Sequence, residues 1–323
     1  MSIRIAGILA LCAASLHASA LDLPRDGWVR WRVPAAEGAP AWCCAGDWNH
    51  RNSEFKLCRL DAPQWGYGNL SREAAISEVD IHVHQTGGVP TQLRALAPSC
   101  HVVTESPVKQ LANVTADASA AWLARQVGAK AIRSHALAAL SVQDGPAARK
   151  ALLDSASKGR DAAERKESIF WMVQGRGTEG FEMAAPYLRD DTDPKVREHA
   201  AFALSQSRAR DAAPLLIRAA REDPAPKVRA QAWFWLAQTK APQTEAAIGQ
   251  ALDEERDGHV REQAVFALSQ LGDERGARAL IALLENRRLP HDIRKRAVFW
   301  LGQSNSDTAI RTLDRLLAAT PPR

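Results

Sequence analysis

An arginine that recurs at a nearly constant interval is the strongest constraint on how this chain folds. The interval is 32 residues four times and then 33, for the six arginines Arg133, Arg165, Arg197, Arg229, Arg261 and Arg294. Alanine or serine follows each arginine by three positions, and leucine or methionine follows it by seven. These positions, with the one directly before the arginine, fall on one face of a helix. A period of this length is typical of helical repeats that stack to bury a continuous core.

Each repeat is predicted to contain two helices. Asp161, Asp193 and Asp257 stand four positions before the arginine, where aspartate caps the free amides at a helix start. Second amphipathic stretches follow at residues 212–220, 245–252, 277–284 and 310–317. Two helices per period make one hairpin, so we expect residues 117–323 to form an α-solenoid of about six helical hairpins.

Further columns accompany the arginines of the later repeats. Phenylalanine stands five positions after the arginine, at Phe170, Phe202, Phe234, Phe266 and Phe299, and glutamine nine positions after it, at Gln174, Gln206, Gln238, Gln270 and Gln303. The sixth position alternates between large and small side chains, as Trp171, Ala203, Trp235, Ala267 and Trp300. We interpret the alternation as a duplicated two-hairpin unit, in which a tryptophan fills the space left by alanine in the next layer.

The arginine column resembles a basic binding stripe, but a structural role is favoured. A guanidinium has five fixed donors, and the turn aspartates and carbonyls of neighbouring hairpins lie within its reach. We therefore predict that the arginines form a structural ladder between hairpins.

The repeats resemble a known family. The pattern D-x-x-V-R-x-x-A-x-x-x-L, from Asp193 to Leu204 and again from Asp257 to Leu268, resembles HEAT repeats of the short class first named from phycobilin lyases. The resemblance covers about residues 118–319 and implies a right-handed solenoid whose concave side is lined by the helices that contain the arginines. The whole chain is similar to exported bacterial HEAT-repeat proteins.

Residues 1–20 have the pattern of an export signal. Arg4 is followed by an apolar stretch at residues 5–16 and by the cleavage motif Ala18-Ser19-Ala20. Lipoprotein processing at Cys12 is the alternative, but Leu11 stands where a small residue is needed. We expect a periplasmic or secreted protein that is not inserted in the membrane after signal cleavage.

Residues 21–116 are expected to form a separate disulfide-bonded domain. Cys43, Cys44, Cys58 and Cys100 are an even set, which in an oxidising compartment predicts two disulfides. A bridge between adjacent cysteines is strained, so Cys43 pairs with either Cys58 or Cys100, and Cys44 with the other. Zinc coordination is the alternative, but the usual C-x₂₋₄-C pairs are missing.

The same domain shows strand signals. Apolar and polar residues alternate over residues 79–84, Gly87 and Gly88 turn the chain, and residues 92–96 can return as a partner strand. The domain also contains five of the tryptophans, Trp28, Trp31, Trp42, Trp48 and Trp65. The predicted fold is therefore mainly α, with a small β-hairpin domain before the solenoid.

The polar side of the predicted hairpin is a candidate metal site. Asp80, His82 and His84 project from one strand face about 7 Å apart, and His101 could complete the set. The simpler interpretation is a solvated strand face. A metal-binding or sequestering module is thus the alternative function.

We expect the solenoid to bind a protein. The net charge of +5 is spread along the chain among acidic residues, which does not favour nucleic acid as a partner. The position two after each arginine varies where the packing columns repeat, which suits partner recognition. The candidate interaction surface is His199, Gln231, Gln263 and Arg296. The expected function is a non-catalytic protein–protein interaction scaffold in the cell envelope.

An enzymatic function is not expected. HEAT-like solenoids include an iron hydroxylase of lysine-derived side chains, whose ligands are repeated His-Glu pairs just after the arginine. The corresponding pairs here are Lys166-Glu167, Glu198-His199, Ala230-Gln231, Glu262-Gln263 and Lys295-Arg296. None is His-Glu, and no serine or cysteine nucleophile with its base is evident. We therefore expect no catalytic residues and no cofactor.

Overall fold

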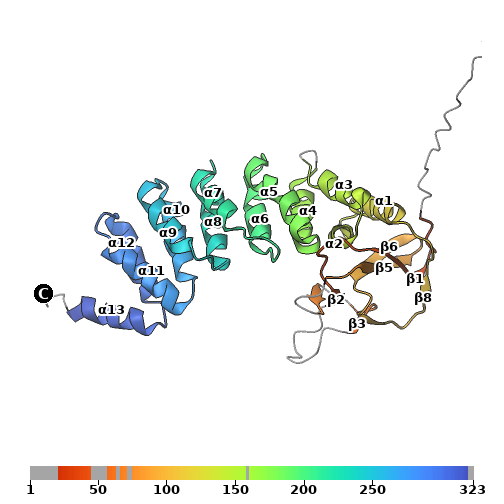
Figure 1. Cartoon of the computed structure of the whole chain (residues 1–323), viewed down its shortest axis with the longest axis horizontal. Coiled ribbons are helices and arrows are strands. Elements are labelled where there is room, and N and C mark those ends of the chain that lie inside the picture. The colour runs from red at the N-terminus through yellow and green to blue at the C-terminus, as the bar shows by residue number, and fades with distance from the viewer. Residues whose placement is uncertain (1–20, 45–56, 63–65, 71–74, 158–159, 319–323) are drawn as a thin grey trace, which may run out of the picture.

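The computed structural model describes residues 21–44, 57–62, 66–70, 75–157 and 160–318. The expected signal segment, Trp48 and Trp65 lie outside these residues. The described residues form eight strands followed by thirteen helices, with the strands gathered at one end of a long helical array (Figure 1). No helix in this part of the chain combines the length and the apolar character that a membrane span requires.

The largest sheet has four strands in the order β6-β5-β1-β8. Their bounds are β1 Gly27–Pro34, β5 Glu78–Thr86, β6 Val89–Leu96 and β8 Val108–Gln110. Strands β5 and β6 form the predicted hairpin, and Gly87 and Gly88 turn the chain with φ angles of 61° and 84° that favour glycine. The hairpin prediction is confirmed.

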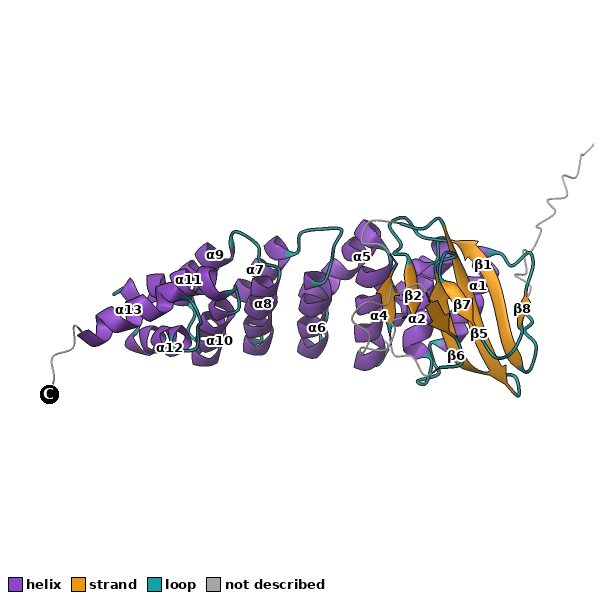
Figure 2. Ribbon diagram, turned by 90° about the horizontal axis from the view of Figure 1, so that it is seen from below, coloured by secondary structure: helices purple, strands orange, loops and turns teal. Residues whose placement is uncertain are grey.

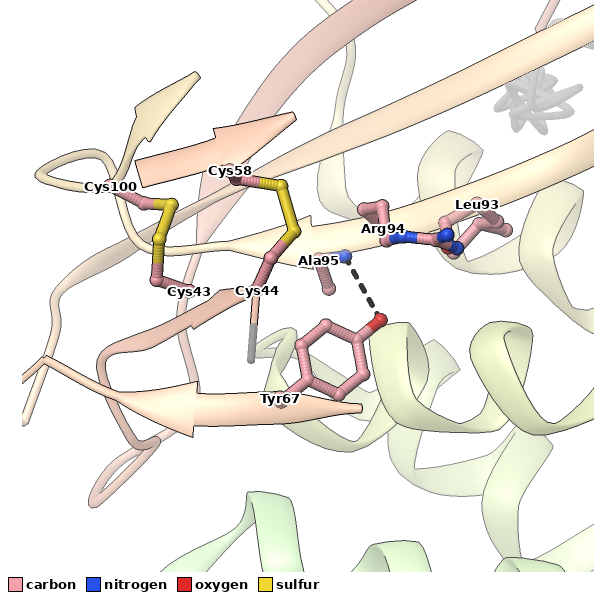
Figure 3. The surroundings of a disulfide bond; sticks show 8 residues. All are labelled: Cys43, Cys44, Cys58, Tyr67, Leu93, Arg94, Ala95 and Cys100. Carbon is pink, nitrogen blue, oxygen red and sulfur yellow. Dashed lines mark hydrogen bonds between the residues drawn. A yellow bond between two sulfur atoms is a disulfide. The ribbon is translucent and has the colours of Figure 1, made fainter. Parts of the chain in front are cut away.

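Two small sheets carry three of the cysteines, and Cys100 directly precedes one of their strands. Strand β2 (Trp42–Cys44) pairs with β4 (Tyr67–Asn69), and β3 (Leu57–Arg59) pairs with β7 (His101–Val103). The disulfides join Cys43 to Cys100 and Cys44 to Cys58, with Cα–Cα distances of 5.3 and 5.0 Å (Figure 3). Of the two pairings left open by the sequence, the structure has the one with Cys43–Cys100.

The helices form two rows, which Figure 2 shows along the array. One row consists of the arginine helices, so named because each contains one of the recurring arginines: α2 (Arg133–Val142), α4 (Ala162–Gly175), α6 (Pro194–Ser205), α8 (Pro226–Gln238), α10 (Gly258–Ser269) and α12 (His291–Leu301). The other row consists of α1 (Ala116–Gln126), α3 (Pro146–Ser155), α5 (Gly177–Asp190), α7 (Ala213–Glu222), α9 (Thr244–Glu254), α11 (Asp273–Glu285) and α13 (Asp307–Ala318).

This arrangement confirms a helical-hairpin array. Helices α1 to α12 form six hairpins, α13 follows them, and each arginine helix packs against the next. Asp161, Asp193 and Asp257 cap α4, α6 and α10 through hydrogen bonds from backbone amides, as their sequence positions predicted.

The eight strands β1 to β8, called the strand module below, share one core with the first helical hairpin. The apolar face of the four-stranded sheet lies in the same buried cluster as the helices of the array. Trp31 of β1 contacts Trp122 of α1 edge to face, with ring centroids 5.6 Å apart, and its indole nitrogen donates to Ser119 Oγ at 2.8 Å. The hydroxyl of Ser119 donates in turn to Gln143 at the end of α2. Apolar packing and a satisfied buried polar network therefore both fix the sheet to the start of the array.

Candidate functional site

The recurring arginines lie between hairpins as a ladder. Arg197 of α6 donates from Nε and Nη2 to the two carboxylate oxygens of Asp223, at 2.7 and 2.8 Å, and from Nη1 to the backbone oxygen of Asp191 at 2.8 Å. Asp191 and Asp223 are the residues that end α5 and α7, and both are buried. A bidentate pair of this kind uses the fork of the guanidinium fully.

Arg229 repeats these contacts, and Arg165 makes a looser version in which only Nη2 donates to Asp191, at 3.3 Å. Arg165 pairs with Asp191, with 3.2 Å between Nε and Oδ2, and Arg229 makes two hydrogen bonds to Glu255 and one to the backbone oxygen of Asp223. Each of these aspartates thus binds one arginine with its side chain and the next with its carbonyl oxygen. Each arginine with its acidic partner is called a rung below. The predicted structural ladder is confirmed for Arg165, Arg197 and Arg229, whose guanidinium groups are paired with acids and do not form a basic binding surface.

Aromatic rings form a second continuous feature on the arginine helices. Phe170 stacks on Phe202 with ring centroids 5.9 Å apart, and Phe234 stacks on Phe266 at 6.0 Å. These four rings are partly exposed, and Phe299 at the end of the row is 51% exposed. The side of the arginine helices that carries Phe170, Phe202, Phe234, Phe266 and Phe299 is called the aromatic face below.

The alternating tryptophans connect the phenylalanines into one row. Trp235 packs on Phe202 of the preceding arginine helix at 4.8 Å between ring centroids, and Trp300 packs on Phe266 at 4.9 Å. Each of these tryptophans therefore contacts the phenylalanine of the preceding arginine helix. In that helix the residue after the phenylalanine is a small one, Ala203 or Ala267. Trp235 also contacts Phe234 on its own helix. Along the row, stacked phenylalanine pairs therefore alternate with tryptophan–phenylalanine contacts. This alternation corresponds to the two-hairpin repeat seen in the sequence.

The strand module supplies the first members of this row. Helix α2 has Ala138 where the later arginine helices have phenylalanine. Trp42 and Tyr67 from the disulfide-bonded strands contact Trp171 instead, with ring centroids 5.5 and 5.9 Å apart. The hydroxyl of Tyr67 accepts a hydrogen bond from the backbone amide of Ala95, which fixes the ring between β6 and the array (Figure 3). The row therefore runs without a break from the strand module to α12.

The four predicted interaction residues lie on the arginine helices beside this row. His199 is half-buried, with its ring 5.5 Å from that of Phe202. Burial, with a smaller effect of Lys166, lowers the pKa of His199. Gln231 is exposed on α8 and Gln263 is half-buried on α10. Arg296 forms an ion pair with Glu262 of the preceding arginine helix, so its charge is partly neutralised.

The phenylalanine column is the part of the face to which the sequence analysis gave no binding role. The second and fifth positions after the arginine are about 60° apart around a helix, because each residue turns the chain by about 100°. That spacing places Phe202 near His199 and could have identified the column. A hollow of about 300 Å³ also lies between α10 and α12, lined by Glu262, Asp292, Ile293, Lys295, Arg296 and Phe299.

The solvated-face interpretation of the hairpin is wrong. Asp80 and His82 are only 3% and 2% exposed, because the disulfide cluster packs on that side of the sheet together with Trp28 and Leu96. Both carboxylate oxygens of Asp80 accept hydrogen bonds from Arg32, at 2.7 and 2.9 Å. Burial lowers the pKa of His82 to about 4.

The structure also gives the metal hypothesis no support. His84 Nδ1 is within 2.9 Å of the hydroxyl of Thr91, and Asp80 is already paired with Arg32. His101 lies on β7, in a different sheet from the other three residues. Within the ranges that the structure describes, no group of three His, Cys, Asp or Glu side chains is arranged to hold a metal ion.

Comparison with known proteins identifies the repeats. Residues 181–233 and 216–290 match HEAT repeats, so this part of the array consists of HEAT repeats, which form a helical repeat scaffold. No curated protein matches its sequence. One similar solved structure is that of human deoxyhypusine hydroxylase in complex with glycerol, at 18% identity and a TM-score of 0.28, with 64% of this chain and 80% of the hydroxylase covered. A likeness of this size supports no conclusion about activity.

Proposed function

We propose that this protein is a non-catalytic scaffold that binds a protein partner on the aromatic face. The observation that supports this function is the unbroken aromatic row, whose phenylalanines stay partly exposed along five consecutive arginine helices. Aromatic rings supply large contact areas at a small cost in conformational entropy, and they are enriched in protein interfaces. A row fixed by ring-to-ring contacts is also ordered before a partner binds.

The polar residues of the face suit the same role. Gln206 and Gln270 donate to Ser205 and Ser269 on their own helices, which orients their side-chain carbonyl oxygens. Energetically dominant contacts lie near the centre of an interface, where water is excluded. We place this centre at Gln231 and Gln263, on the two helices that carry the stacked pair Phe234 and Phe266. Arg296 lies at the edge, where charges affect mainly the rate of association.

The compartment is part of the proposal. Two disulfides within one small module favour an oxidising environment. With the export signal expected at residues 1–20, they favour a periplasmic or secreted protein of bacterial type. We infer in addition that the array is a right-handed solenoid, as in the short HEAT-like class that the repeat pattern resembles.

A pair of charge-matched variants tests the proposal. The double variant Gln231→Glu and Gln263→Glu places two carboxylates at the centre of the face. The control, Ala246→Glu and Ala282→Glu, places two carboxylates at exposed positions of α9 and α11 in the other row. Both proteins are first checked for helix content and melting temperature by circular dichroism.

Capture of the partner is then compared. Crosslinking in a periplasmic extract should recover the same partner with the wild type and with the control, and at least tenfold less with the face variant. Equal recovery with all three proteins would show that the aromatic face is not the binding site.

A further inference from the structure

The arginine ladder loses its acidic residue after α11. Three consecutive second-row helices are followed by an acid, Asp191 after α5, Asp223 after α7 and Glu255 after α9, but α11 is followed by Asn286. Asn286 keeps the local role of these acids, because its side-chain oxygen accepts from the amide two residues later at 3.1 Å, as that of Asp223 does at 2.9 Å. It lacks their charge.

Arg261, whose partner position Asn286 occupies, is consequently left without a bidentate partner, and no described residue forms a bidentate pair with Arg294. Arg261 has its nearest carboxylate, Asp292, at 3.7 Å, and that carboxylate is 64% exposed. The Nε atoms of Arg261 and Arg294 are buried and have no hydrogen-bond partner among the described residues. The Nε of Arg165 shares this property, but Arg165 still donates from Nη2 to the buried carboxylate of Asp191, whereas Arg261 and Arg294 have no buried carboxylate among the described residues. Arg197 by contrast uses both sides of its guanidinium on buried acceptors. A buried donor without an acceptor is unfavourable, and a carboxylate is its best acceptor.

The surrounding sequence adds positive charge at this point. Residues 286–296 contain five arginines or lysines and a single acid, Asp292. Arg287 and Arg288, in the turn between α11 and α12, are exposed. The open end of the ladder is therefore a local basic site, although the chain as a whole is only weakly basic.

We propose that the open rungs at Arg261 and Arg294 bind an acidic segment of a partner protein, whose carboxylates take the place that Asp223 and Glu255 fill in earlier rungs. This inference rests on the proposed function, because Phe299 at the end of the aromatic face lines the same hollow as Asp292, the carboxylate beside Arg261. A partner that follows the face reaches the open rungs at its end. Planar carboxylates match the bidentate geometry that the closed rungs already show.

A single substitution closes the open rung from within the chain. In Asn286→Asp the new carboxylate occupies the cap position and competes with a carboxylate supplied by the partner. Asn286→Ala removes the amide without adding charge. Ala282→Asp is the matched control, because it adds the same charge one turn earlier on the exposed side of α11.

The probe is a fluorescein-labelled octapeptide of alternating alanine and glutamate, compared with the same peptide containing glutamine. Fluorescence anisotropy at fixed salt should show at least tenfold tighter binding of the glutamate peptide to the wild type, to Asn286→Ala and to Ala282→Asp. Asn286→Asp should lose this preference, and its melting temperature should rise by an amount that Arg261→Ala cancels. Equal binding of the two peptides to the wild type, or a preference that survives in Asn286→Asp, would overturn the proposal.

Binding of the partner at the aromatic face and binding of an acidic segment at the open rungs can be disproved independently. The variant Gln231→Glu with Gln263→Glu should still prefer the glutamate peptide, even though it loses the partner. Suppose that this variant no longer captures the partner but the wild type binds the glutamate and glutamine peptides equally. The aromatic face then remains the binding site, and the proposal that an acidic segment binds the open rungs is wrong.

Discussion

Arg197 and Asp223 form a bidentate ion pair that joins two neighbouring hairpins, with their side chains only 8% and 4% exposed. Asp223 then receives Arg229 on its backbone oxygen. Because one residue serves two consecutive arginines, each rung of the ladder is fixed to the next. The ladder thus joins consecutive hairpins, in addition to the direct packing of each arginine helix on the next.

The ladder predicts unequal effects for equal substitutions. Arg197→Ala leaves the carboxylate of Asp223 buried without its partner, which typically costs about 3–5 kcal/mol of unfolding free energy. Arg229→Ala should also be clearly destabilising. Arg261→Ala removes only an exposed ion pair and should cost about 1 kcal/mol or less. Urea unfolding at pH 7 measures all three, and an unchanged midpoint for Arg197→Ala or Arg229→Ala would rule out a structural role for the column.

The repeat array was predictable because its residues recur. The arginine period, the caps at Asp161, Asp193 and Asp257, and the second amphipathic stretches all correspond to observed helices. The strand module has no internal repetition, so sequence reasoning found the β5–β6 hairpin and left the pairing of the cysteines open. The packing of Trp42 and Tyr67 on Trp171 depends on contacts between distant segments and has no local signal.

The candidate site stays a prediction, although its position relative to the rings follows from the helical period. His199 contacts the ring of Phe202, and Gln231 and Gln263 hold the equivalent positions on α8 and α10. The burial of Asp80 was missed, since alternation along a strand shows that one face is polar but not what covers it. The ion pair between Arg296 and Glu262 joins two repeats, so a pattern within one repeat could not predict it either.

The cysteine pairing predicts which thiol each substitution releases. In Cys100→Ser the freed thiol should be Cys43, and in Cys58→Ser it should be Cys44. Alkylation without reductant, followed by fragment mass spectrometry, distinguishes the two adjacent positions. The loss of either bridge should cost about 2–5 kcal/mol. Label on Cys44 in Cys100→Ser would contradict the structure, and four labelled thiols in the wild type purified without reductant would exclude both disulfides.

A buried and a half-buried histidine, His82 and His135, make the protein sensitive to mild acid. Burial lowers the pKa of His82 and of His135 to about 4, and Arg94 adds to the effect on His135. Histidine in the unfolded chain titrates near pH 6.5, so between about pH 6.5 and pH 4 the unfolded chain binds protons that the folded chain does not. The free energy of unfolding should therefore decrease as the pH falls through this window, by up to about 3 kcal/mol for each histidine.

His135→Phe isolates one of these contributions. The Nδ1 atom of His135 is buried without a hydrogen-bond partner, and its ring lies 6.5 Å from that of Tyr67, so a phenyl ring suits the site. Urea unfolding at pH 7, 6 and 5 should show a smaller loss of stability in the variant than in the wild type. Parallel pH profiles would show that His135 is not held neutral by the fold.

Close packing of the first arginine helices predicts a sensitive glycine. A Cβ atom on Gly175 of α4 would lie 1.9 Å from the hydroxyl of Ser141 in α2, whereas one on Gly249 of α9 would have no atom within 4 Å. Gly175→Ala should therefore lower the stability by about 1–3 kcal/mol through overpacking. Gly249→Ala should raise it by up to about 1 kcal/mol, because alanine favours helix. Thermal unfolding of the two variants should shift in opposite directions, and a shift of the same sign would contradict the close contact.

Site-specific photocrosslinking tests most directly whether the aromatic face binds the partner. A photoreactive phenylalanine is placed at Gln231 on the aromatic face or, as the control, at Ala246 in the other row, both of which are exposed. Irradiation in the native compartment should give a discrete crosslinked product from position 231 and none from position 246, and Phe266→Ser should reduce the product. A product from position 246 alone, or equal products from the two positions, would contradict the assignment of this face.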